Sequence, residues 1–163
     1  MKILTGILET DNVPETLKTV TAIAESCGSS AVIIDAAKVA GKNHIEAAVT
    51  HAHRSFAAGT AIARTLPMEI LVYASGQRQC SCAAKFGLHA GKNTVYIVID
   101  GGDEEKTAKL LREQIFREGP VDPADTAVLM QEFAITAEEL AIVGADRIEE
   151  LVIERVALVD AGK

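Results

Sequence analysis

Residues 94–103 read Thr-Val-Tyr-Ile-Val-Ile-Asp-Gly-Gly-Asp and carry the clearest signal of the fold class in this 163-residue chain. The first six residues form an apolar run without alternation, which predicts a strand that is covered on both faces. Asp103 then starts an amphipathic helix whose apolar positions are Ala108, Leu111 and Ile115. A buried strand followed by an amphipathic helix is typical of an α/β protein.

The rest of the chain extends this pattern. Further strands are predicted at residues 2–8, 31–34 and 69–73. Helices are predicted after Asn12, over residues 44–58, in a short piece at 62–66 and over 77–86. A loop at 118–125 leads into two or three final helices. The sequence therefore predicts one α/β domain over residues 1–163, with a mixed β-sheet, flanking helices and a helical C-terminal region.

Three helix starts carry the residue spacing of a capping box, in which side chains satisfy the free N–H groups of the first turn. The pairs are Asn12 with Glu15, Asn43 with Glu46, and Thr136 with Glu139.

Composition excludes several classes of protein. No apolar run reaches the ~18 residues of a membrane span, and the N-terminus lacks the pattern of a secretory signal. Three cysteines are an odd count without framework spacing, so we expect a reduced cytoplasmic protein. His51 and His53 lie two positions apart, as do Cys80 and Cys82, so on a helix the members of each pair point apart and predict no metal site.

Charge is distributed unevenly along the chain. The net charge is −7, yet residues 38–92 hold seven basic and two acidic residues, a local charge of +5. The remainder carries −12. A basic middle in an acidic chain favours local recognition of an anion, although chance variation on a solvated surface gives the same count.

No catalytic group emerges from the sequence. Residues 87–93 resemble a phosphate loop but are one residue short, and Asn93 stands where a magnesium-binding Ser or Thr belongs. Ser75 lacks the first glycine of a nucleophile elbow and reads as a helix cap. We therefore expect a binding or accessory protein, without a cofactor, rather than an enzyme.

Two predicted helix starts could bind an anion with their free N–H groups. One holds Arg78 and Gln79, and the other holds Lys42, Asn43 and His44. The alternative is that polar residues simply gather at helix starts.

The stretch 146–160 suggests a docking helix. Drawn as a helix, it places one apolar stripe on the core side, with Ile153 opposite and Leu158 widening the apolar sector. Surplus apolar surface of this kind can bind a partner. If residues 151–159 form a strand instead, the sequence gives no evidence for a docking helix.

One segment resembles a known family, the PRPK-binding proteins (TPRKB and its archaeal relatives), which form the small kinase-binding subunit of the KEOPS complex. The similarity covers about 65 residues, in the run Asn43-His44-Ile45 with Ala47-Ala48, then Ala-Arg64-Thr65-Leu66-x-x-Glu69-Ile70-Leu71-x-Tyr73-x-Ser75-Gly76-x-Arg78-Gln79, then Ala83-Ala84-Lys85-Phe86-Gly87. Cys80 departs from it, standing where an aliphatic residue is expected.

The resemblance implies a non-catalytic subunit with an α/β fold. Such a subunit binds and stimulates a small atypical kinase/ATPase and helps recruit tRNA through its 3′ CCA end, for threonylcarbamoyladenosine modification beside the anticodon. Within that hetero-oligomeric complex, we expect Lys42, Asn43, His44, Arg64, Arg78 and Gln79 to face tRNA, and Ile153 and Leu158 to contact the kinase. Two other classes stay open: a small acyl- or nucleotide-binding enzyme with Ser75 and Gly91-Lys92 in its site, and a structural adaptor without RNA affinity.

Overall fold

The computed structural model describes residues 1–162, and its contacts group the chain into two compact units. We call Met1–Ala36 with Gly87–Asp122 the sheet unit. Ala37–Phe86 with Pro123–Lys163 form the helical unit. The single domain over residues 1–163 stays a prediction.

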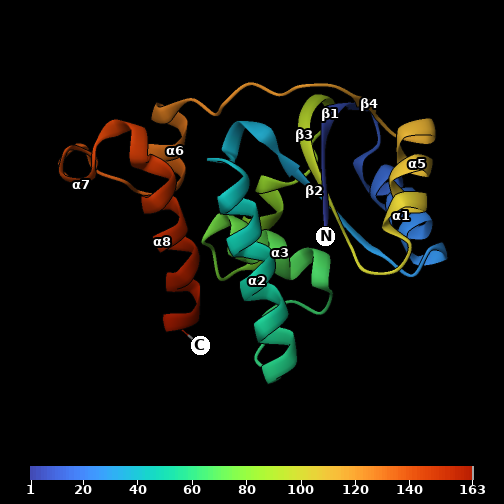
Figure 1. Cartoon of the computed structure of the whole chain (residues 1–163), viewed down its shortest axis with the longest axis horizontal. Helices are drawn as coiled ribbons and strands as arrows, with labels where there is room; N and C mark the ends of the chain where they lie inside the picture. The colour runs from blue at the N-terminus through green and yellow to red at the C-terminus, as the bar shows by residue number, and fades with distance from the viewer. Residues whose placement is uncertain (163) are drawn as a thin grey trace. The chain divides into compact units, whose positions relative to one another are not determined.

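The sheet unit contains four strands in the order β2-β3-β1-β4 (Figure 1). They are β1 (Lys2–Thr10), β2 (Ser30–Asp35), β3 (Gly91–Asp100) and the two-residue β4 (Arg117–Glu118). The α/β class and the strands predicted at 2–8, 31–34 and 94–99 are confirmed. Within the sheet, however, all three pairings are antiparallel. β1 and β2, which helix α1 joins, do run in the same direction, but β3 lies between them, so the expected mixed pairing does not form.

Helices α1 (Val13–Ser26) and α5 (Glu104–Gln114) cover one face of this sheet (Figure 1). Alternate residues of β1 face them, so Leu4 and Leu8 are buried with Ile97 of β3 and Leu111 of α5. The Asn12 side chain accepts from the Glu15 N–H, and Asp103 caps α5. The box predicted at Asn12 forms only in part, because the Asn12 N–H donates to the Thr10 hydroxyl. An apolar core between helices and sheet therefore organises this unit.

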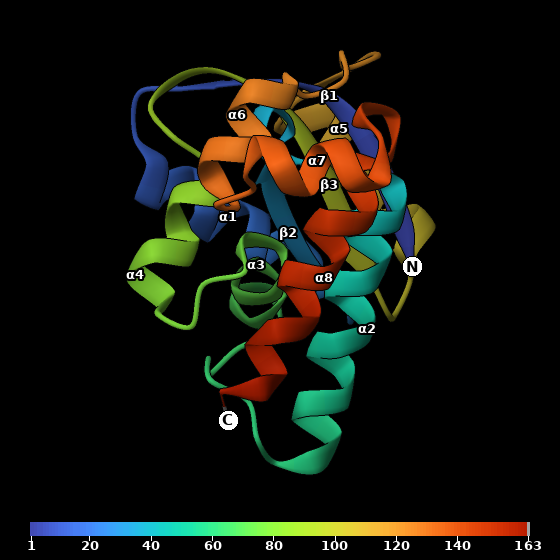
Figure 2. The same ribbon diagram turned by 90° about the vertical axis from the view of Figure 1, so that its left-hand side faces the viewer.

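The helical unit is built on two long helices, α2 (Lys42–Ala58) and α8 (Ile148–Ala161), which lie side by side (Figure 2). The other elements are α3 (Leu66–Ser75), α4 (Cys80–Ala83), α6 (Thr126–Glu132), α7 (Ala137–Val143) and the short 3₁₀ turns η2 (Ala84–Phe86) and η3 (Ala145–Arg147). A further turn, η1 (Ala36–Lys38), precedes α2. Within residues 1–162, no helix is both long and apolar enough to cross a lipid bilayer.

The strand predicted at residues 69–73 is wrong, because these residues lie inside helix α3. Thr65 caps the helix by accepting a hydrogen bond from the Met68 N–H, and Gly76 ends it in the left-handed conformation. Residues 69–75 are all buried, so the helix is apolar around most of its circumference and lacks a one-sided stripe. The continuous apolar run that suggested a strand is therefore equally typical of a buried helix.

Three helix boundaries also differ from the predictions. Residues 62–65 form bends rather than a helical piece, and the helix expected over 77–86 shrinks to α4 and η2. The capping box at Asn43 does not form, because α2 starts after Gly41 and its N-cap has no side-chain hydrogen bond. The box at Thr136 and Glu139 is confirmed.

Candidate functional site

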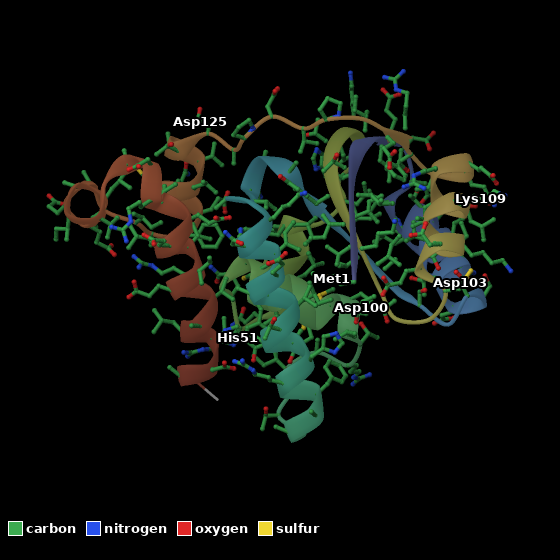
Figure 3. All side chains as sticks on the ribbon, in the orientation of Figure 1. Met1, His51, Asp100, Asp103, Lys109 and Asp125 are labelled. Atoms are coloured by element: carbon green, nitrogen blue, oxygen red, sulfur yellow. The ribbon has the colours of Figure 1, made fainter. Side chains whose placement is uncertain are left out.

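All the residues expected to face tRNA or the kinase lie in the helical unit. Acidic residues near both ends of α8 bond this helix to its neighbours. Near its start, Glu149 accepts hydrogen bonds from the Asn43 side chain (3.2 Å) and the His44 backbone N–H (3.3 Å). Near its end, Asp160 bonds His51 Nδ1 at 2.7 Å; His51 is labelled on α2 in Figure 3. The contact partner moves forward along α2, from Asn43 to His51, as it moves forward along α8, from Glu149 to Asp160, so the two helices run in the same direction.

Asp160 also accepts a hydrogen bond from the Tyr73 hydroxyl at 2.5 Å, which ties α3 to the same point. The Tyr73 ring stacks on His51 with centroids 5.3 Å apart. Burial raises the pKa of Tyr73, and the bond to Asp160 raises it further. The hydroxyl therefore stays protonated and keeps donating at physiological pH.

His44, expected to face tRNA, is fully buried. Its Nδ1 accepts from the Ala40 N–H at 3.1 Å, so Nε2 carries the proton and donates to the Ala74 carbonyl at 2.8 Å. Burial lowers the pKa of this imidazole, and the bond to Ala74 and the charge of Glu149 oppose the shift only in part. In this structure His44 is a neutral link between α2 and α3 and has no access to RNA.

Glu69 is a second buried polar group. It stands at the start of the strand predicted over 69–73, and its burial was not predicted. Its carboxylate accepts from the Ser55 hydroxyl at 2.5 Å and from the N–H groups of Ile62 and Ala63 at 3.0–3.1 Å. These bonds hold the bent segment 62–65, which carries the exposed Arg64, against α2 and α3. The sequence does hold a signal for this site, because a charged residue beside an apolar run indicates a buried carboxylate with hydrogen-bond partners.

Two residues expected to face tRNA lie beside one expected to face the kinase. Arg78, Gln79 and Leu158 line one hollow of about 440 Å³, together with Gly76, Gln77, Cys82 and Val159. Arg78 Nη2 donates to the Leu158 carbonyl at 3.4 Å, and the guanidinium lies over Gly162, where a side chain would collide with it. A cation at this place complements the C-terminal end of the α8 dipole. Arg78 and Gln79 precede the short α4, so they do not open a long helix as expected.

The other expected tRNA residues lie elsewhere in the unit. Lys42 and Asn43 are exposed at the start of α2, beside Glu149. Along α8, Glu149 and Leu158 are separated by about 14 Å of helix axis. The six residues therefore form no single cluster: one pair lies at the start of α2, another lines the hollow, Arg64 lies before α3, and His44 is buried.

Ile153 and Leu158 do not share a face of α8. Five residues turn a helix by about 140°, and the two side chains flank the buried stripe on opposite sides. Leu158 is 51% exposed, whereas Ile153 is half-buried. A single partner surface can therefore reach Leu158 far more readily than Ile153.

The basic middle of the chain leaves several charges available to a ligand. Among residues 37–86, four exposed cations have side chains without a hydrogen bond or ion pair: Lys42, Arg54, Arg64 and Lys85. Lys38, by contrast, donates to the Lys85 carbonyl, pairs with Glu132 and lies over the Phe86 ring. Arg54 and Lys85 were not singled out in the sequence, where only their membership of the basic segment marked them.

Ser75 does not have the environment of a nucleophile. It is buried at the end of α3, where its hydroxyl donates to the Val72 carbonyl and accepts from the Gln77 N–H. Among residues 1–162, no group of three His, Cys, Asp or Glu side chains could hold a metal ion.

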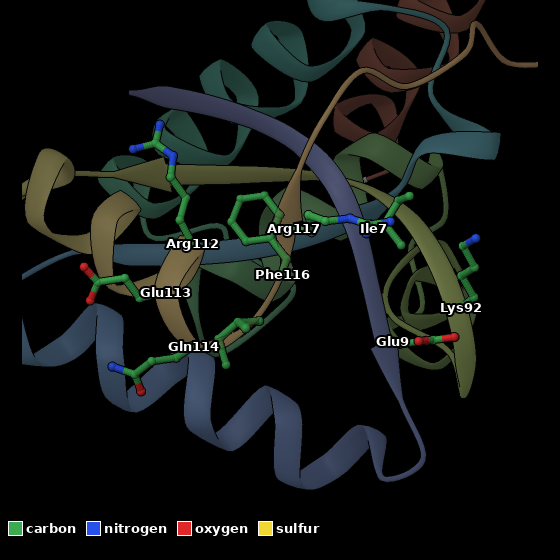
Figure 4. Close-up of a pocket in the computed structure, with 9 residues that line it drawn as sticks. Ile7, Glu9, Lys92, Arg112, Glu113, Gln114, Phe116 and Arg117 are labelled. Carbon is green, nitrogen blue, oxygen red and sulfur yellow. The ribbon is translucent and has the colours of Figure 1, made fainter.

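A separate hollow of about 420 Å³ lies in the sheet unit, at the edge of β1 (Figure 4). Lys92 and Arg117 line it together with the acidic Glu9 and Glu113. Both signs of charge are present, and none of the expected tRNA- or kinase-facing residues lies there.

Comparison of the sequence with known proteins identifies a family. Residues 10–160 match the family model described as kinase binding protein CGI-121. None of the curated protein sequences compared with the chain matches it. The match spans nearly the whole chain and both units, and the chain therefore belongs to the CGI-121 family of kinase-binding proteins.

Proposed function

We propose that the chain is the non-catalytic regulatory subunit of a KEOPS-type tRNA-modification complex. In this role it binds and stimulates the small atypical kinase/ATPase subunit and helps recruit tRNA through its 3′ CCA end for threonylcarbamoyladenosine modification. The observation that carries the proposal is membership of a kinase-binding family over residues 10–160. A hetero-oligomeric, cytoplasmic complex and one functional domain belong to the same proposal.

Leu158 is the proposed kinase contact on α8. It is the exposed one of the two candidate residues, and it lines a hollow, so a partner could bury its apolar side chain. Ile153 contacts the kinase only if its half-buried side chain becomes accessible in the complex.

Recruitment of tRNA is supported by charge. Residues 37–86 hold six basic and two acidic residues, and four of the cations are exposed and free of intramolecular partners. Free cations can neutralise phosphates and release counterions, which is the main source of affinity for a nucleic acid. Lys42, Asn43, Arg64, Arg78 and Gln79 remain the proposed contacts, and the burial of His44 leaves it out.

A catalytic role is the weaker alternative. A small acyl- or nucleotide-binding enzyme would need Ser75 in reach of its substrate, and Ser75 is buried with its hydroxyl engaged. That alternative requires turnover by the isolated chain that Ser75→Ala abolishes.

The deciding experiment compares binding of the purified chain to intact tRNA and to tRNA lacking its CCA end, at low and moderate salt. We expect tighter binding to intact tRNA, weakened as salt rises. Arg64→Ala and Arg78→Ala should each weaken tRNA binding several-fold and lower the salt dependence by about one phosphate contact. Arg64 is the cleaner site, because Arg78 also bonds α8.

Lys109→Ala is the matched control, since Lys109 is an exposed cation on α5 of the sheet unit (Figure 3). It should bind tRNA like the wild type. Kinase binding should survive Arg64→Ala and Arg78→Ala. Equal tRNA affinity of these variants and the wild type would remove the RNA contacts from the proposal, and the chain would then be a kinase-docking adaptor.

A further inference from the structure

Helix α7 exposes apolar surface to an unusual degree. None of its residues is buried, and its Ile142 is 84% exposed, more than any other large hydrophobic side chain in residues 1–162. Ala137 and Ala141 are exposed as well, and Leu140 and Val143 are only half-buried. A helix gains most of its stability by burying an apolar face, and α7 buries only part of Leu140 and Val143 in the isolated chain.

Polar contacts hold α7 firmly in place instead. Thr136 and Glu139 form a capping box at its start. Arg155 of α8 donates from Nη2 to both Glu139 oxygens at 2.8 and 2.9 Å, and it also donates to the carbonyls of Phe133 and Ala134 at 3.1 Å. These last bonds fix the turn before α7, where Ala134 takes a left-handed backbone conformation (φ 52°). The exposed apolar residues are thus presented by a preorganised element, which lowers the entropy that binding would cost.

Acidic residues lie near Ile142 in the sequence and on α7. Residues 123–163 contain nine acidic and three basic residues. Glu138 lies one helical turn before Ile142 on the same side of α7, and Asp146 follows in η3; neither is paired with a cation within residues 1–162. Such a surface repels RNA and anionic membranes, and it complements a protein surface in which lysine or arginine side chains surround an apolar recess.

We propose that α7 is a docking element for the kinase, and that Ile142 enters an apolar recess of the kinase edged by basic side chains. This inference rests on the proposed kinase-binding function. It adds a contact that the sequence pattern on α8 did not indicate, and it assigns the acidic C-terminal segment to the kinase and the basic segment to tRNA.

The test measures the affinity of the full chain for its purified kinase partner by titration calorimetry, at low and moderate salt. Ile142→Asp should weaken binding about a hundredfold, and Ile142→Ala about tenfold, because a central apolar anchor loses its buried contact. The double variant Glu138→Lys with Asp146→Lys should slow association about tenfold, and wild-type binding should weaken as salt rises. Because Ile142 is exposed, the variants should keep the wild-type circular dichroism spectrum and Tm.

Leu17→Asp is the matched control, since Leu17 is a 41% exposed aliphatic residue on α1 of the sheet unit. It should bind the kinase like the wild type, and Ile142→Asp should bind tRNA like the wild type. Wild-type kinase affinity of Ile142→Asp alongside a loss in Leu158→Asp would overturn the inference and leave kinase binding intact. No binding of the kinase by the wild-type chain would overturn the proposed function and this inference together.

Discussion

The two units of the chain are specified in different ways. The sheet unit has an apolar core in which Leu4, Leu8, Ile97 and Leu111 pack between sheet and helices. The helical unit places polar groups at the points where its helices meet: Glu69, His44, and Asp160 with its partners. Apolar contacts tolerate many arrangements of similar volume, whereas a buried polar group needs particular partners. The comparison suggests that polar groups fix the arrangement of the helices that carry the proposed binding residues.

Substitution by methionine should give the largest difference in stability loss between the polar interior of the helical unit and the apolar core of the sheet unit. Glu69→Met keeps most of the side-chain volume but leaves the N–H groups of Ile62 and Ala63 without their acceptor. The Ser55 hydroxyl loses its bond to Glu69 and keeps the Ala52 carbonyl as an acceptor. We expect a loss of about 4 kcal/mol in the free energy of unfolding, mainly from the two unsatisfied N–H groups. Leu111→Met in the sheet unit should cost less than about 1.5 kcal/mol.

Urea denaturation followed by circular dichroism measures both values. Glu69→Gln should recover part of the loss, since its amide oxygen still accepts hydrogen bonds. A Glu69→Met protein within about 1 kcal/mol of the wild type would show that volume matters more than the acceptor, and the contrast between the units would disappear.

The same contrast explains what the sequence could predict. Strands β1, β2 and β3 and the capped starts of α1, α5 and α7 follow from local periodicity and capping spacing, so they were predicted correctly. The helix α3 was missed because its apolar run has no periodicity. The site was predicted less well, since the burial of His44 and the neighbourhood of Arg78 and Leu158 arise from long-range contacts.

The buried His44 should make the stability of the chain depend on pH, which an apolar core does not. Its folded-state pKa lies below the unfolded value of about 6.5, mainly because burial disfavours the imidazolium. Below pH 6.5 the unfolded chain therefore binds more protons than the folded chain, and stability falls as pH falls, by at most about 1.4 kcal/mol per pH unit. Glu104, Glu139 and Glu150 have lowered pKa values and lose their contributions only below about pH 4.5, outside this window.

Urea denaturation at pH 7.5 and 5.5 should show that the wild type loses about 1 kcal/mol more than His44→Gln between the two pH values. His89→Gln, in which an exposed histidine of the sheet unit is replaced, should keep the wild-type pH dependence. If His44→Gln lost as much stability on acidification as the wild type, the buried imidazole would not be the pH-sensitive link between α2 and α3.

The smallest change in stability is expected for an exposed ion pair on the surface of the helical unit. Arg147 bonds Glu150 in two places, and this pair raises the pKa of Arg147 and lowers that of Glu150, but both side chains are more than half exposed. Water and salt screen such a pair, so Arg147→Ala should change Tm by no more than about 1 °C. Arg155→Ala should lower Tm by several degrees, because Arg155 is 19% exposed and its loss removes the donor of the Phe133 and Ala134 carbonyls and the ion pair with Glu139. Thermal denaturation of both variants in the same buffer tests this difference. Equal losses would mean that exposed charge stabilises the unit as much as partly buried hydrogen bonds, and the polar contacts between helices would no longer be the feature that distinguishes it from the sheet unit.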